Sequence, residues 1–168
     1  MNTMKKYISL IVLALALSFS GAKAQDWMSF QAANCLCKAK FPARPDLSQQ
    51  QVQGFKSHQS IARFNEGAYL LDYSFLQEPL DKANAKIASR QAVKDFGESL
   101  NANLVSAKKW KMKGWEGFQT QMEVPGSDEF IFYNVVIVNR IRYEVAVLAK
   151  EEHGRKVAKK FVKSFKLT

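Results

Sequence analysis

Residues 118–147, FQTQMEVPGSDEFIFYNVVIVNRIRYEVAV, carry the pattern that decides the fold class. The first seven residues alternate between apolar and polar, which is typical of a strand with one buried face. Pro125 and Gly126 suit a tight turn. Residues 130–138 are apolar in both registers apart from one asparagine, as in a central strand covered on both faces. Residues 141–147 alternate again, so this stretch predicts three consecutive strands in an antiparallel meander.

Two helices are predicted in the sequence around this meander. Asp81 is a good N-cap for a long helix over residues 82–101, where apolar side chains recur at spacings of three and four. A second helix over residues 151–165 has an apolar stripe that includes Phe161 and Phe165, surrounded by basic residues. Basic amphipathic helices can bind anionic lipid. Because the preceding strand needs this stripe to cover its apolar face, we expect the helix to pack against the sheet instead.

The chain before the first helix predicts further strands. Residues 34–41 alternate, and residues 69–75 place aromatic side chains on one face with Asp72 opposite. Residues 51–64 are polar but strand-like in part, whereas residues 42–53 form the only linker-like stretch. The whole pattern predicts an α+β fold, in which an antiparallel β-sheet is flanked by a long central helix and a C-terminal helix.

The N-terminus predicts an export signal. Lys5 and Lys6 precede an apolar run that is shorter than the roughly 20 residues of a membrane span. Ala22 and Ala24 then provide the small residues that favour cleavage after Ala24. No cysteine follows the apolar run at once, so lipidation is not expected. We therefore expect residues 1–24 to be a signal peptide and residues 25–168 to be a single α+β domain, periplasmic or secreted.

Composition narrows the functions that the chain can have. The sequence has 168 residues, a net charge of +10 and 47% hydrophobic residues, which fits one basic domain with a core. Two cysteines exclude a disulfide-dense scaffold and a four-cysteine zinc site, and two histidines further limit the groups available for catalysis or metal binding. The sequence has no glycine-rich phosphate-binding loop and no recognisable catalytic motif. We therefore expect no catalytic residues, no cofactor and no enzymatic activity.

Cys35 and Cys37 are the first candidate site. On a strand, positions i and i+2 lie about 6.6 Å apart on one face, which is the upper edge of disulfide geometry. A disulfide would therefore need a kink in the strand. Two thiolates on one face could instead hold a soft metal such as Cu(I). Since free cysteine is among the most buried residue types, we expect two buried, reduced thiols, with the disulfide and the metal as alternatives.

A basic segment with two tryptophans is the second candidate site. Trp110 and Trp115 are interleaved with Lys108, Lys109, Lys111 and Lys113. Aromatic side chains among cations can stack on single-stranded nucleic acid, but an exported protein seldom meets it. We expect a sheet edge whose lysines block the addition of other strands. The two tryptophans then lie in the core or at its border. If they are exposed together instead, they could form a surface for a ligand or partner.

Three short sequence motifs resemble those of a known class of proteins. They are KFPARP at residues 40–45, GWEGF at residues 114–118 and FVKSFKL at residues 161–167. In this order and spacing the chain resembles small exported bacterial proteins of the PsbP-like class. The resemblance implies a PsbP-like sandwich of an antiparallel sheet and flanking helices. That class includes accessory and binding proteins and has no shared catalytic motif, so it implies no site residue here. Ala43 stands where members often have glycine.

These observations favour a non-enzymatic extracytoplasmic accessory or interaction module. Its partner could be another envelope protein, with at most weak electrostatic association with a membrane surface and no binding of nucleic acid. A carrier of a small apolar ligand is the alternative, and it would need a cavity lined by Tyr69, Tyr73, Phe96 and Phe130. A hydrolase with an unrecognised site would need a cleft that holds carboxylates of strongly shifted pKa.

Overall fold

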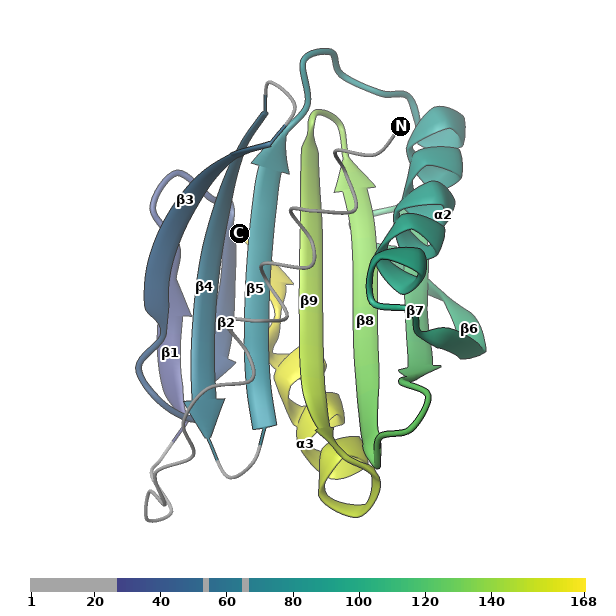
Figure 1. Cartoon of the computed structure of the whole chain (residues 1–168). Coiled ribbons are helices and arrows are strands. Elements are labelled where there is room, and N and C mark those ends of the chain that lie inside the picture. Colours follow the sequence, from purple (N-terminus) through teal and green to yellow (C-terminus); the bar gives the residue numbers. More distant parts are fainter. Residues whose placement is uncertain (1–26, 53–54, 65–66) are drawn as a thin grey trace.

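The computed structural model describes residues 27–52, 55–64 and 67–168. The expected signal peptide and its cleavage site after Ala24 lie outside the described residues. Two antiparallel sheets are stacked, and the smaller one lies behind one side of the larger (Figure 1). The smaller sheet has the order β1-β2-β10, with bounds Met28–Gln31, Cys37–Phe41 and Lys166–Leu167.

The main sheet has seven antiparallel strands in the order β3-β4-β5-β9-β8-β7-β6. Its last three strands in the chain are the expected meander, which the pairing of β7 with β8 and of β8 with β9 confirms. The bounds are β3 (Asp46–Val52), β4 (Phe55–Phe64), β5 (Gly67–Phe75), β6 (Asn103–Met112), β7 (Trp115–Glu123), β8 (Glu129–Val138) and β9 (Ile141–Lys150).

The helix α2 (Lys82–Ser99) covers β7 and β8 on one face of the main sheet (Figure 1). It begins where the sequence predicts, because the Asp81 side chain accepts a hydrogen bond from the backbone N–H of Asn84 at 2.8 Å. Gly97 is buried and faces Met122 of β7, as expected for a glycine at a close helix–sheet contact. The α2 face of the sheet forms one apolar cluster with buried side chains of β5, β8 and β9.

The helix α3 (Glu151–Ser164) packs on the opposite face of the main sheet. Phe161 is fully buried, with its ring 4.9 Å from that of Phe41 and 5.6 Å from that of Tyr69. Its apolar stripe is therefore used inside the protein, as expected. No helix in the described part of the chain combines the length and apolar character that a membrane span requires.

One expectation for the first half of the chain is wrong in detail. The linker-like stretch at residues 42–53 contains β3, which pairs with β4 over its whole length. β3 is a polar edge strand, so it shows no hydrophobic period. Asp72, which the sequence places opposite the aromatic face of β5, is buried, because both faces of this central strand are covered. The short strands β1 and β10 were not expected at all.

Candidate functional site

An open groove of about 330 Å³ lies between the small sheet and one edge of the main sheet. We call it the β1–β3 groove. β1 and the turn after it form one wall, β3 forms the other, and β4 and β5 form the floor. Residues that line it include Phe30, Ala33, Leu47, Gln49, His58 and Tyr73.

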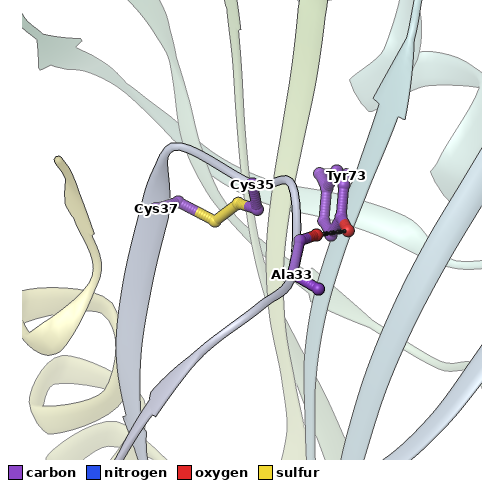
Figure 2. Close-up of a disulfide and its surroundings, with 4 residues drawn as sticks. All are labelled: Ala33, Cys35, Cys37 and Tyr73. Atoms are coloured by element: carbon purple, nitrogen blue, oxygen red, sulfur yellow. Dashed lines mark hydrogen bonds between the residues drawn. A yellow bond between two sulfur atoms is a disulfide. The ribbon is translucent and has the colours of Figure 1, made fainter.

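The floor of the β1–β3 groove is an aromatic stack. The ring of His58 lies parallel to that of Tyr73, with an interplanar angle of 4° and centroids 4.7 Å apart. The Tyr73 hydroxyl donates a hydrogen bond to the backbone carbonyl of Ala33, which ties the β1–β2 turn to β5 (Figure 2). Burial, and then the negative charge of Asp72, raises the pKa of Tyr73. The phenol therefore stays protonated and able to donate at neutral pH.

A disulfide between Cys35 and Cys37 holds the same turn (Figure 2). The expectation that both side chains are buried is confirmed, at 3% and 0% exposure, but the expectation of reduced, metal-free thiols is wrong in their redox state. The reason is local geometry. Asn34 has a φ of 60°, and Cys35 lies in the turn before β2, not on the strand. The Cα–Cα distance falls to 5.1 Å, within the normal disulfide range.

The disulfide also removes the soft-metal alternative for these two cysteines, since their sulfurs are bonded to each other. In the part of the chain that the structure describes, no three His, Cys, Asp or Glu side chains gather as a ligand set. Between the bridged cysteines, Leu36 is 63% exposed. The turn therefore buries both cysteines and exposes the leucine between them to solvent.

Trp110 lies on β6 and Trp115 on β7, at the edge of the main sheet opposite to β3 and the groove. Both are partly buried against the core cluster below α3. The Trp110 ring packs 5.6 Å from that of Phe165, and the Lys82 ammonium lies 6.0 Å from the Trp115 ring. Both tryptophans are therefore partly buried residues at the border of this apolar core. A role of the two tryptophans as a ligand or partner surface stays a prediction.

An acidic pair, in which Asp72 is buried and Glu144 is partly buried, lies near the centre of the main sheet. Asp72 accepts hydrogen bonds from the Ser57 hydroxyl at 2.7 Å and 2.9 Å and from the Gln59 amide at 2.9 Å. Glu144 is its partner in the register of β5 and β9. Glu144 accepts a hydrogen bond from Tyr133 and lies 3.5 Å from Arg142. Burial raises the pKa of Asp72 to about 7, and the charge of Glu144 adds to this effect.

The pKa of Asp72 makes stability depend on pH. The folded chain holds this proton up to about pH 7, whereas the unfolded chain releases it near 3.8. The free energy of unfolding should therefore fall as pH rises from about 4 to 7, by up to roughly 4 kcal/mol. Asp72→Asn should flatten this slope and be the more stable form above pH 7. Urea unfolding of the full chain at several pH values measures it; an unchanged slope in the variant would contradict a neutral, buried Asp72.

Comparison with known proteins shows the fold alone. No protein-family model and no curated protein matches the chain. Among solved structures, cyanobacterial PsbP (CyanoP) from Synechocystis sp. PCC 6803 superposes with a TM-score of 0.61 at 10% identity. The match covers 91% of this chain and 99% of that one. The fold is PsbP-like. At this identity the comparison establishes architecture alone, and it confirms the α+β sandwich that the sequence pattern and its resemblance implied.

This PsbP-like fold does not bring together the residues expected to line a carrier cavity. Tyr69 and Tyr73 belong to the apolar core cluster that also contains Phe161 of α3. Phe96 lies on the other face of the sheet, where its ring stacks on that of Tyr133 with centroids 4.0 Å apart. These rings therefore line no common cavity, and the groove that does exist uses only Tyr73 among them.

Sequence reasoning missed most of the β1–β3 groove. Phe30 lies on a strand that was not expected, and Leu47 and Gln49 lie in the supposed linker. The sequence contained one signal for β3. The seven residues that follow Pro45, from Asp46 to Val52, include neither Gly nor Pro. Such a run is long enough for a strand even when it is polar.

Proposed function

We propose that this PsbP-like domain is a non-enzymatic accessory or interaction module that works outside the cytoplasm. The position of the β1–β3 groove carries the proposal. The groove is open and lined by apolar, aromatic and amide side chains, which suits binding. The carboxylate with the raised pKa is enclosed instead, at 4% exposure, and Ser57 and Gln59 occupy its oxygens. The open surface and the perturbed acid are thus separate, which argues against general acid–base catalysis.

The Cys35–Cys37 disulfide supports the proposed location. Disulfides form and persist in oxidising compartments such as the periplasm or the cell exterior and are rare in the cytosol. This agrees with the proposal that residues 1–24 direct export and are removed after Ala24. The working form would then begin at Gln25 and be periplasmic or secreted.

Mass spectrometry of protein purified from its own host tests the location and the role together. Under denaturing conditions we expect a chain that starts at Gln25 and is two daltons lighter than its dithiol form. Under native conditions we expect a retained polypeptide partner. A chain that keeps residues 1–24 would contradict export. Protein that retains nothing, even after cross-linking in the host, would contradict the interaction module.

A carrier of a small apolar ligand is the second candidate, and the groove volume favours it. About 330 Å³ lies in the range of small-molecule sites. The same native spectrum separates the two functions. A retained mass of a few hundred daltons, displaced when Leu47 is changed to Asp, would favour the carrier over the interaction module.

A further inference from the structure

The two edges of the main sheet differ in how they are protected. An unpaired edge can accept a strand from another chain, and natural proteins block this with lysine, proline or a bulge. At one end, β6 carries Lys108, Lys109 and Lys111 and has a register shift between Leu104 and Ser106. This edge has the features that oppose strand addition, as the sequence predicts.

The opposite edge, β3, has none of these features. Residues 46–52 contain no Lys, Arg or Pro, and they pair with β4 without a register shift. No described strand pairs with the outer side of β3. Its backbone N–H and C=O groups that point away from β4 are therefore open to a partner. A regular edge of seven residues is long enough to hold a strand of typical length.

The β1–β3 groove lies directly beside this edge. Leu47 is 67% exposed at its rim, so an apolar side chain is accessible to a partner there. Gln49 is opposite His58 in the β3–β4 register, so it stands above the His58–Tyr73 stack. Alternate side chains of a strand added to β3 would point to this same side. The edge offers hydrogen bonds, and the groove offers space for a side chain.

We propose that β3 binds an extended segment of a partner polypeptide by strand addition, with an apolar side chain of that segment in the β1–β3 groove. Backbone hydrogen bonds would supply affinity, and the groove would supply selectivity at alternate positions. This inference rests on the proposed function as an interaction module, and it names the surface and the kind of partner.

Two proline variants identify the edge-facing backbone groups. Adjacent residues of a strand direct their N–H groups to opposite sides, so only one of Ser48 and Gln49 donates to β4. Proline removes the N–H group and blocks approach of a strand on that side. Of Ser48→Pro and Gln49→Pro, one should melt near the wild-type temperature, and that variant has lost only an outward-facing donor. Lys108→Pro and Lys109→Pro are made separately on β6, and the one that likewise melts near the wild-type temperature is the control for the other edge.

The probe is a displayed library of peptides of roughly 10 residues, enough to span a strand. Wild type should enrich peptides in which apolar and polar residues alternate. Binding should weaken ~10-fold or more in the stable β3 proline variant and in Leu47→Asp, because each loses a contact of the proposed site. The β6 control should bind as wild type does. Hydrogen exchange should show new amide protection in residues 46–50 of the complex.

Three outcomes would overturn the inference. One is the enrichment of no peptide, and another is peptides that bind the stable β3 proline variant as tightly as wild type. The third is a wild-type dimer that this proline makes monomeric, because a second copy would then be the occupant. If native spectra still show a partner after any of these, the interaction module stands and only its docking at β3 fails.

Discussion

Gly117→Ala is expected to destabilise the protein by ~3 kcal/mol or more, at the upper end of overpacking effects. A Cβ atom at position 117 would lie 2.0 Å from the Val135 carbonyl oxygen and 2.8 Å from the Val136 Cα. Both contacts are with the backbone of β8, so no side-chain rotation can relieve them. The melting temperature should fall by roughly 6–12 °C for a domain of this size.

Gly97→Ala is the matched control for this substitution. The same added Cβ would meet its nearest neighbour, the Ala102 carbonyl oxygen, at 3.4 Å, and the Met122 sulfur at 3.6 Å. These are ordinary contacts, and alanine favours a helix over glycine by about 0.5–1 kcal/mol. The control should therefore melt at or above the wild-type temperature. A Gly117→Ala variant that melts with the control would contradict the close approach of β7 to β8.

Phe161→Ala is expected to cost about 3–5 kcal/mol, the range for removing a buried aromatic side chain. The ring is fully buried and contacts those of Phe41, Tyr69 and Trp27. Because these rings join α3 to both sheets, little can move to fill the space. Urea unfolding of the full chain measures the loss. The exposed Lys163→Ala on the same helix should stay within about 0.5 kcal/mol of wild type.

The same variant decides whether α3 acts on membranes. If Phe161→Ala keeps the wild-type stability but loses co-sedimentation with anionic liposomes, the helix is a membrane element and its packing role is wrong. We expect the reverse, a destabilised protein whose association with such liposomes, at most weak and salt-sensitive, is unchanged while it is folded. The exposed lysines that would cause any such association lie on the outer side of the helix, away from the buried ring.

The carboxylate pair shows why burial could not be assigned from alternation alone. Asp72 and Glu144 occur opposite apolar faces of their strands, which predicts solvent exposure for a sheet with one covered side. Their strands β5 and β9 lie in the middle of the main sheet, where both faces are covered. The position of a strand within a sheet depends on the whole chain, so neither its second covered face nor the shift in pKa was visible from local pattern.

The sequence by itself determined the elements that carry strong periodicity or a specific cap. The meander, the start of α2 at Asp81 and the inward stripe of α3 follow from apolar spacing and hydrogen-bonding chemistry within a few residues. The lysines of β6 likewise identified a sheet edge. These features depend on neighbours in sequence, so the pattern was sufficient to predict them and the α+β class.

Only the tertiary structure decided the site. β3 is mostly polar on both sides, and it becomes a strand because β4 supplies its hydrogen bonds. The Cys35–Cys37 disulfide requires the turn at Asn34, which shortens a distance that a straight strand would leave too long. The β1–β3 groove joins Phe30, Leu47 and Tyr73 across three strands of two sheets. Contacts between residues distant in sequence create each of these features, and no local pattern encodes such contacts.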